Sequence, residues 1–248
     1  LQPEWGQTDV AIQVCGDDET TVAHARRMLL KDARSFATVR WVQHGFRRAR
    51  GSEAAGTTMR NVMGQVDGTV NPVEAEADFA DVVWAAEPEA FAGGTFMVVR
   101  RIRAHLDAWD RVDRAGRELT IGRRLDTGAP LTGEDEFDEP DFEATDASGL
   151  LVIDPASHVR RARGDGTERI LRRGYNYAVT GPDGEEDSGL VFVAFAADLE
   201  RQFVPIQQRL AEEDRLNAWV TAIGSAVYAV LPGVAEGETP GAALLGER

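Results

Sequence analysis

The chain has 248 residues, of which 43% are hydrophobic and 28% charged, as in an ordinary soluble globular protein with a sizeable core. No apolar run is long enough to cross a bilayer, and the formal net charge of −15 argues against a nucleic-acid partner, because phosphate binding depends on Lys and Arg. The single cysteine, Cys15, excludes an internal disulfide and a multi-cysteine metal site.

The first third of the chain predicts a strand, a helix and a second strand. Residues Thr8–Cys15 alternate apolar and polar, as in a half-buried strand, and Cys15 is expected there as a small buried hydrophobe. Gly16-Asp17-Asp18 breaks this strand and offers an N-cap for a helix over Glu19–Ala33, whose apolar residues recur at helical spacing. Residues Ala37–Val42 predict the second strand, and the basic stretch Gly45–Gly56 predicts a loop.

A glycine-containing loop follows, with a carboxylate at its centre. Residues Asn61–Pro72 (NVMGQVDGTVNP) lack regular periodicity, and two glycines bracket Asp67. Such a loop can present a short carboxylate to a cavity and let backbone approach a ligand closely. The acidic segment Glu74–Asp81 comes next, and a domain boundary is expected at Pro88–Gly94.

The rest of the chain predicts more strands and helices, separated by irregular stretches. A strand is expected over Thr95–Ile102, and Ala104–Val112 with the residues that follow are expected to be helical. Leu119–Pro130 and the acidic loop Glu134–Asp146 form a long irregular region, and the acidic loop is interpreted as a solvated surface. The later elements are strands over Arg169–Val179, Leu190–Ala196 and Trp219–Leu231, a turn over Gly181–Ser188, a helix over Asp198–Glu213 and a tail from Pro232.

The order of these elements predicts the fold class. From Thr95 to Leu231 it is strand, helix, strand, strand, helix, strand, which is the split βαβ of a ferredoxin-like unit. The first third gives only half of the same order. We therefore expect an α+β protein of two ferredoxin-like halves, of the dimeric α+β barrel type. Residues 1–90 would form a partial first half with the Asp67 loop, and residues 91–248 a second half.

The segment Ser157–Tyr177 supplies the residues best suited to hold a ligand. A neutral imidazole such as that of His158 is the commonest metal ligand among side chains, and a proximal histidine is a standard ligand of haem iron. Arg172 and Arg173 begin an apolar, aromatic strand, and strand alternation sends their side chains to opposite faces. An arginine stays charged in a pocket and can face a developing anion.

Motifs along nearly the whole chain carry a family resemblance. MGQVDGTVNP matches a GxxDG loop, ASHVRRA a segment with a proximal histidine, and ILRRGYNY a strand with a distal arginine; LTIGRRLDTGAPL and LVFVAFAADLERQF match further segments. In these motifs and their order, the chain resembles the dye-decolourising peroxidases. The resemblance implies two ferredoxin-like halves and haem b, bound non-covalently, and no CxxCH attachment motif is present.

The resemblance implies roles for four residues. His158 would be the axial iron ligand, Asp67 the distal carboxylate, Arg172 the distal arginine, and Arg123 a contact of a haem propionate. Arg173 stays open as the alternative to Arg172, because the loop between His158 and the arginine pair is short. Structural readings also stay open: a hydrogen-bonded loop histidine, a turn aspartate and a solvent-exposed arginine.

The expected chemistry needs these residue types. A carboxylate near the iron can move a proton between the oxygens of hydrogen peroxide, and a neighbouring guanidinium keeps it ionised. Arg172 would also stabilise the charge that develops as the O–O bond breaks. The other ring nitrogen of His158 should donate to an acceptor, for which Asp198 is the candidate, with a helix N-cap as its alternative role.

The sequence is thus interpreted as a haem-dependent peroxidase that reduces hydrogen peroxide and oxidises bulky aromatic donors such as dyes or phenols. The alternative is a non-catalytic haem-binding protein, or a deferrochelatase-like protein that releases iron from haem. If donors cannot enter the pocket, Trp219, Tyr228 and Tyr175 are candidate electron relays, although filling of the aromatic core is the simpler reading of each.

The resemblance also sets expectations about the whole protein. The family's N-terminal segment, which completes the first half, is absent, so we expect it as a separate chain or as a part lost in processing. The RRGYNY and GAPL signatures resemble the exported, twin-arginine-dependent branch of the family, which implies a location outside the cytoplasm. His24, His44 and His105 have no comparable context and are read as structural, and a homo-oligomer stays open.

Overall fold

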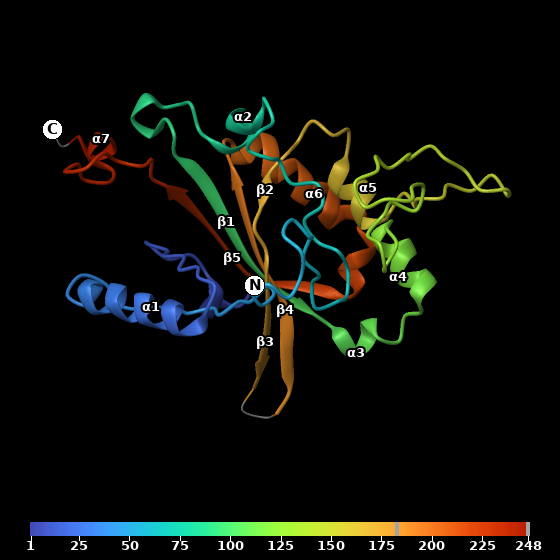
Figure 1. The fold of residues 1–248 in the computed structure, drawn as a ribbon, viewed down its shortest axis with the longest axis horizontal. Helices are drawn as coiled ribbons and strands as arrows, with labels where there is room; N and C mark the ends of the chain where they lie inside the picture. The colour runs from blue at the N-terminus through green and yellow to red at the C-terminus, as the bar shows by residue number, and fades with distance from the viewer. Residues whose placement is uncertain (182–183, 247–248) are drawn as a thin grey trace.

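An antiparallel sheet of five strands organises the part of the chain that the computed structural model describes, residues 1–181 and 184–246. The strands are β1 (Thr95–Ala104), β2 (Leu171–Arg172), β3 (Tyr175–Thr180), β4 (Glu186–Ala196) and β5 (Val220–Val230). β1 pairs with β4 and β5, and β4 pairs on its other edge with β2 and β3 (Figure 1). β2 and β3 keep one register against β4, because Arg172 is opposite Ala194 and Tyr175 is opposite Val191.

The helices complete a ferredoxin-like order. Three helices connect β1 to β2: α3 (Leu106–Trp109), α4 (Arg114–Ile121) and α5 (His158–Arg163). α6 (Val204–Glu213) connects β4 to β5. With fully antiparallel pairing, this is the split βαβ arrangement. The prediction of an α+β, ferredoxin-like fold is confirmed.

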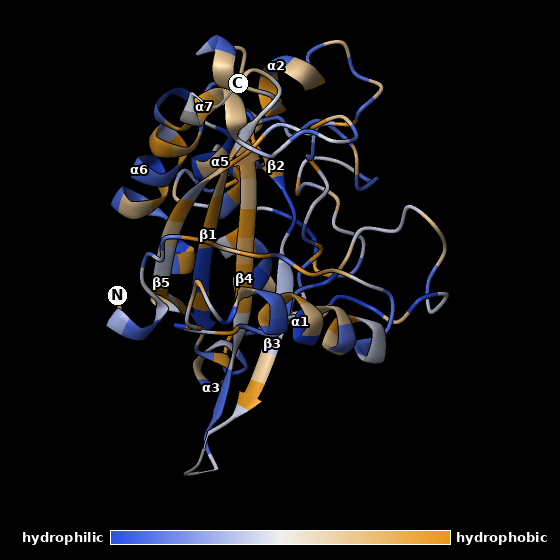
Figure 2. Ribbon diagram, turned by 90° about the vertical axis from the view of Figure 1, so that its left-hand side faces the viewer, coloured by the Kyte–Doolittle hydropathy of each residue, from blue (hydrophilic) through white to orange (hydrophobic). Residues whose placement is uncertain are grey.

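The two faces of the sheet are covered differently. α4, α5 and α6 lie to the right of the strands in Figure 1, and α1 (Glu19–Ala33) lies to the left. On the α6 face, the core around Ala194 packs against Ile206 of that helix. On the opposite face, the core around Met97 packs against Ala11 from the N-terminal segment. Apolar residues of the strands therefore pack on both faces of the sheet, and Figure 2 shows much of the strands in hydrophobic colours.

The helix predicted over Glu19–Ala33 is confirmed as α1. The carboxylate of Asp18 accepts a hydrogen bond from the backbone nitrogen of Thr21, which is the expected N-cap. No side chain of α1 is buried. The expectation of a buried Cys15 is wrong: this thiol is exposed, with its sulfur 3.3 Å from the hydroxyl of Tyr175.

The strands predicted on either side of α1 are wrong. Residues Thr8–Cys15 and Ala37–Val42 form no strand in the described part of the chain. Instead, the amide of Gln7 hydrogen-bonds the backbone of Val227, so a side chain attaches this segment to β5. Alternation of apolar and polar residues indicates a half-buried segment, but a strand also needs a neighbouring strand to pair with, and the alternation does not show whether one is present.

The helical stretch predicted for Ala104–Val112 and the residues that follow is found as two helices, α3 and α4. The carboxylate of Asp113 accepts from the backbone of Gly116 and so starts a new helix. α4 runs into the stretch predicted as irregular and ends at Gly122, whose φ of +88° favours glycine.

The remaining short elements refine the predicted boundaries. A π-helical turn, Leu199–Phe203, precedes α6. Residues 182–183 of the predicted turn and 247–248 of the predicted tail lie outside the described residues. In the ranges that the structure describes, no helix has the length and apolar character that a membrane crossing requires. The other short elements are α2 (Phe79–Val83), α7 (Ala242–Leu245) and 3₁₀ turns at Pro3–Trp5, Glu89–Phe91 and Arg215–Ala218.

Candidate functional site

The loop that carries Asp67 is shaped by its first residue. Oδ1 of Asn61 accepts hydrogen bonds from the backbone nitrogens of Met63 and Gln65, at 3.1 Å each. Gly68 has a φ of +127°, in the region that favours glycine. The two glycines and Asn61 therefore hold the backbone on both sides of Asp67, as the sequence motif predicts.

Asp67 forms an ion pair with Arg172 of β2. Nη1 of Arg172 donates to Oδ1 of Asp67 at 2.7 Å, and the amide of Asn61 reaches the other oxygen, Oδ2, at 3.4 Å. Burial alone raises the pKa of Asp67, but the charge and hydrogen bond of Arg172, with help from Asn61, outweigh it and hold that pKa below its ordinary value. Asp67 is therefore an ionised carboxylate with one oxygen only weakly engaged.

Two asparagines fasten the Asp67 loop to the edge strands, and the sequence reading missed both. The side chain of Asn71 accepts from the backbone nitrogen of Arg172 at 2.9 Å and donates to its carbonyl at 2.7 Å. Asn176 of β3 accepts from the nitrogen of Val62 and donates to the carbonyl of Arg60 in the same way. The Asp67–Arg172 pair is thus fixed by backbone contacts on both sides.

His158 is the first residue of α5, and its partner is Asp214. Nδ1 of His158 lies 2.6 Å from Oδ2 of Asp214, whose side chain is 3% exposed. An ionised carboxylate can only accept, so Nδ1 carries the hydrogen and the lone pair of a neutral ring is on Nε2. Oδ1 of Asp214 accepts from the backbone of Leu216, which fixes the carboxylate in place.

The candidate acceptor Asp198 is wrong. Its carboxylate accepts from the backbone nitrogen of Arg201, so it has the N-cap role that was its alternative. Asp214 lies just after α6 and is itself an N-cap that accepts from the backbone of Leu216, so no local signal in the sequence set it apart from Asp198. A second pair steadies the same region, since Arg215 donates two hydrogen bonds to the carboxylate of Asp154.

Arg123 is buried directly after the turn that ends α4. Its Nη1 donates to the carbonyls of Gly128 (2.7 Å) and Glu136 (2.8 Å). Burial lowers the pKa of Arg123, and the charge of Glu136 opposes that effect. A side chain on Gly122 could not be accommodated, because its Cβ would lie 2.4 Å from Val159 of α5. The close packing of α4 on α5 therefore fixes the position of the backbone from which the side chain of Arg123 extends.

The acidic loop is more than a solvated surface. The carboxylate of Glu136 accepts from the hydroxyls of Thr58 and Thr69, on either side of Asp67 along the chain. Its backbone carbonyl accepts from Arg123, as described above. Glu136 thus links the Asp67 loop to Arg123, a link that its sequence context did not reveal.

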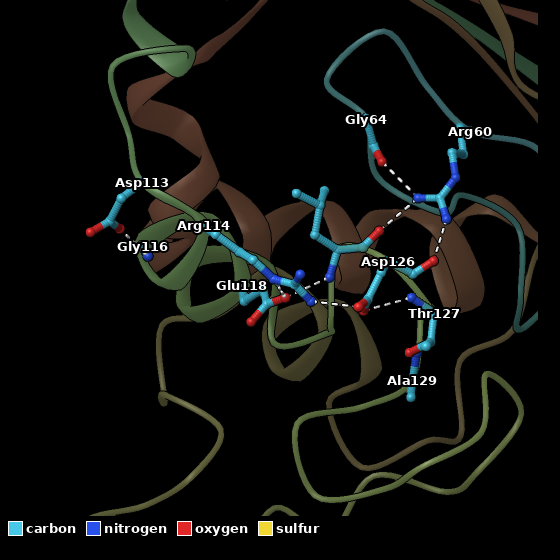
Figure 3. A network of polar contacts seen from close by, with 10 residues as sticks. Arg60, Gly64, Asp113, Arg114, Gly116, Glu118, Asp126, Thr127 and Ala129 are labelled. Atoms are coloured by element: carbon cyan, nitrogen blue, oxygen red, sulfur yellow. Dashed lines mark hydrogen bonds and ion pairs between the residues drawn. The ribbon is translucent and has the colours of Figure 1, made fainter.

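A second polar network ties the Asp67 loop to α4 (Figure 3). Arg60 donates to the carbonyls of Gly64, Leu125 and Asp126. Arg114 of α4 pairs with Glu118 and Asp126, and Glu118 also accepts from the nitrogen of Leu125. The loop with Asp67 and the loop with Arg123 are held together by carbonyl contacts of one arginine.

The predicted site residues meet in one cavity. It has a volume of about 550 Å³ and lies between the sheet and helices α5 and α6; His158, Asp67, Arg172 and Arg123 all line it. Arg173 is exposed and donates to the hydroxyl of Tyr175, so the strand places Arg172 at the cavity instead. Segments far apart in the sequence therefore build a single pocket.

The residues of this cavity fit haem. Its volume is that of a cofactor site, and apolar residues of the sheet and α6 form much of its wall. The donor set matches as well: in the described part of the chain Nε2 of His158 has no hydrogen-bond partner, while Nδ1 has the carboxylate acceptor that iron-ligating histidines use. Arg123 supplies a buried cation for an acidic substituent.

The other sequence candidates lie elsewhere. Trp219 packs edge-on against Trp109, with ring centroids 5.3 Å apart, and the hydroxyl of Tyr228 is 2.7 Å from that of Thr8. These contacts are those of core aromatics, and an electron-relay role for them stays a prediction. His24, His44 and His105 do not line the cavity; His44 contacts Arg26 and His105 contacts Thr221.

Replacing Asp214 with Asn should weaken the hold on haem by about 10-fold and raise the reduction potential of the loaded protein. An amide oxygen is a weaker acceptor than a carboxylate, so the ring of His158 becomes a poorer donor to iron. Haem transfer to excess apomyoglobin and a spectroelectrochemical titration measure the two effects. The matched control is Asp198→Asn, an N-cap carboxylate with no contact to His158. Equal effects of both substitutions would contradict the pairing.

Replacing Arg172 with Leu should move the acid limit of the peroxide reaction to higher pH. Without the guanidinium, burial is left as the largest influence, so the pKa of Asp67 rises. In the unchanged protein the ionised form stabilises the fold above the ordinary pKa of 3.8, and this contribution is lost as pH falls through the lower folded value. The pH profile of the second-order rate constant with peroxide tests this; an unmoved acid limb would refute it.

The fold and site together define a class: a ferredoxin-like α+β protein whose cavity joins a carboxylate-bonded histidine to an acid–guanidinium pair. Comparison with known proteins gives a family with this fold. The model "Dyp-type peroxidase, C-terminal" matches residues 58–235 and "Dyp-type peroxidase, N-terminal" matches residues 1–47. The chain therefore belongs to the Dyp-type peroxidase family, and haem is the cofactor that this membership assigns to it. The boundary predicted near residue 90 stays a prediction.

Individual relatives support the same assignment. The dye-decolorizing peroxidase of Thermobifida fusca is 40% identical over 99% of the chain, and the deferrochelatase of Escherichia coli K12 is 35% identical over 91%. The chain spans only 59% and 55% of these two relatives. Among solved structures, a DyP-type peroxidase from Cellulomonas bogoriensis has a TM-score of 0.94 and 53% identity, covering 99% of this chain and 69% of its own. An oxyferrous/water mixed complex of DtpA from Streptomyces lividans has a TM-score of 0.94 and 41% identity, covering 99% and 68%.

Proposed function

We propose that this chain is the catalytic part of a haem-dependent peroxidase that reduces hydrogen peroxide and oxidises bulky aromatic donors. The observation that carries the proposal is the shared cavity, in which His158, Asp67 and Arg172 meet from three segments. His158 would hold haem b through Nε2, and Arg123 would contact a propionate. Haem iron supplies, when bound, the electrons that reduce the O–O bond.

The chain's own residues would handle the protons and the charge. Among the described residues, the one hydrogen-bond contact of Asp67 Oδ2 is that of Asn61 at 3.4 Å, so this oxygen is free to accept a proton from one peroxide oxygen. Asp67 would then give that proton to the other oxygen, which leaves as water. Arg172, already directed at Asp67, stabilises the negative charge that develops on the leaving oxygen. The low pKa of Asp67 keeps its base form available through the acid range.

The proposal is tested by loading the full chain with haem and following a bulky anthraquinone dye. We expect a ferric haem spectrum and dye bleaching that requires peroxide and slows in Asp67→Asn. If the loaded chain left the dye intact at every peroxide concentration, the peroxidase proposal would fail.

Release of iron from haem is the second candidate, because relatives 35–38% identical to this chain are named deferrochelatases. The two functions leave different products: oxidised dye with haem intact, or iron-free porphyrin. Extraction of the pigment after turnover, followed by chromatography with fluorescence detection, separates them. We expect intact haem, since the partly buried Asp67–Arg172 pair is suited to peroxide chemistry.

We also propose that another polypeptide segment covers the N-terminal region and completes the first ferredoxin-like half. The support is a set of exposed apolar side chains in residues 10–46, among them Val10 (70% exposed), Ile12 (55%) and Phe36 (91%). Native mass spectrometry of the isolated material would identify the partner; a bare monomer, folded and active, would argue against it. A homo-oligomer would appear in the same measurement.

Export from the cytoplasm is proposed on the RRGYNY and GAPL signatures, which resemble those of the twin-arginine-dependent branch. Cell fractionation of the native host tests this directly. Recovery of the protein in the cytoplasmic fraction would overturn it.

A further inference from the structure

Arg100 is a cation inside the cavity, and no carboxylate of the described residues pairs with it. It lies at the middle of β1, opposite Phe192 of β4, and its half-buried side chain lines the same cavity as His158. Nη1 donates to the amide oxygen of Gln207 on α6, and this neutral group is its partner among the described residues. Burial lowers the pKa of Arg100, with no acidic group opposing that effect.

Most arginines that line this cavity pair with a carboxylate; among the described residues, Arg123 is the other exception, and its partners are two backbone carbonyls. The chain has 42 acidic and 27 basic residues other than histidine, so acids are plentiful. Arg172 pairs with Asp67, and Arg169 pairs with Glu76; both arginines line the same cavity. A buried cation without a paired anion is costly, and only a neutral amide meets Arg100 from the protein. The cavity's occupant is the remaining source of an anion.

The distance between Arg100 and Arg172 gives a lower limit for the size of a ligand that contacts both. Across the sheet, Arg172 of β2 is opposite Ala194 of β4, and Ala194 is opposite Val98 of β1. Arg100 is two residues beyond Val98 on β1. Since side chains alternate along a strand, Arg100 and Arg172 face the same side of the sheet. Two strand spacings and two residues place their Cα atoms ~12 Å apart. A ligand that touches both is much larger than peroxide, and it has an anionic group far from the end that Asp67 contacts.

We propose that Arg100, held by Gln207, is a carboxylate-binding subsite of the cavity, which takes one peripheral carboxylate of haem. The inference rests on the proposed function, because it requires haem as the occupant. Arg123 would contact the cofactor from a different element, so the two arginines are separate contributions. The carboxylate of an aromatic acid is the other source with the same chemistry, and the test separates the two.

The test compares haem with its dimethyl ester, which lacks the negative charges. The loaded full chain is mixed with excess apomyoglobin, and the rate of pigment loss is measured for the unchanged protein, Arg100→Met and the control Arg201→Leu. Arg201 has the same charge and a side chain that is 88% exposed. We expect Arg100→Met to speed loss of haem by about 10-fold or more, the size expected of a hydrogen bond to a charged group, but to leave loss of the ester unchanged. The control should change neither.

Other outcomes overturn the inference. Equal acceleration with haem and ester would make Arg100 a packing residue, and no acceleration with either would place no carboxylate at Arg100. Weaker inhibition by benzoate in Arg100→Met, with haem loss unchanged, would assign the subsite to an aromatic acid and not to haem. If Arg100→Met does not fold, Arg100→Lys, which keeps the positive charge, should retain most of the preference for haem over the ester. Loss of that preference in Arg100→Lys, with the fold intact by circular dichroism, would overturn the proposal. An unchanged protein that binds neither pigment would refute the proposed function itself.

Discussion

Asp67→Asn should lower the second-order rate constant for the reaction with hydrogen peroxide by about 10²–10⁴-fold while haem stays bound. Asparagine keeps the shape of the side chain but cannot accept the peroxide proton as a base. Its amide also leaves Arg172 without the carboxylate it now contacts at 2.7 Å. Stopped-flow absorbance after mixing the loaded protein with peroxide measures the constant directly.

The control for this prediction is Asp126→Asn. Asp126 is a carboxylate of the neighbouring loop, paired with Arg114 and outside the cavity lining. Its replacement should leave the rate constant within a factor of about two, since an exposed ion pair contributes little. A rate constant in Asp67→Asn close to that of the control would remove Asp67 from the reaction.

His158→Ala should abolish stable haem binding, with affinity reduced by more than about 100-fold, because even changes to the partners of a ligand cost 10–100-fold. The cavity walls remain, so added imidazole should restore part of the binding by taking the place of the missing ring beside Asp214. Absorbance titration with haem, with and without imidazole, gives both numbers. His105→Ala, which removes an imidazole outside the cavity, should bind as the unchanged protein does. Undiminished affinity in His158→Ala would mean that another residue holds the iron.

Much of the second half of the chain, and one helix of the first half, could be predicted from sequence. Long apolar strands such as β1 and β5, and the capped helix α1, are coded by local patterns that tertiary packing reinforces. Strand alternation also favoured Arg172 over Arg173, and the structure places Arg172 at the cavity. The motifs and their order also predicted that His158, Asp67 and Arg172 belong to one site, because each lies on a short segment with a recognisable pattern.

Contacts between distant segments could not be predicted in the same way. The partner of His158 is Asp214, 56 residues along the chain, whereas Asp198 had an equally good local pattern and is an N-cap. Nothing local tells a helix-capping aspartate from one that also reaches across to a histidine. The expected strands beside α1 failed for a similar reason, because a ladder depends on a partner strand that local alternation does not reveal.

The crystal structure of the haem-loaded chain tests the central claim most directly. We expect the porphyrin in the cavity between the sheet and helices α5 and α6, with Nε2 of His158 on the iron and the Asp67–Arg172 pair over the opposite face. An iron atom ligated by any other side chain, or a porphyrin bound outside this cavity, would contradict it.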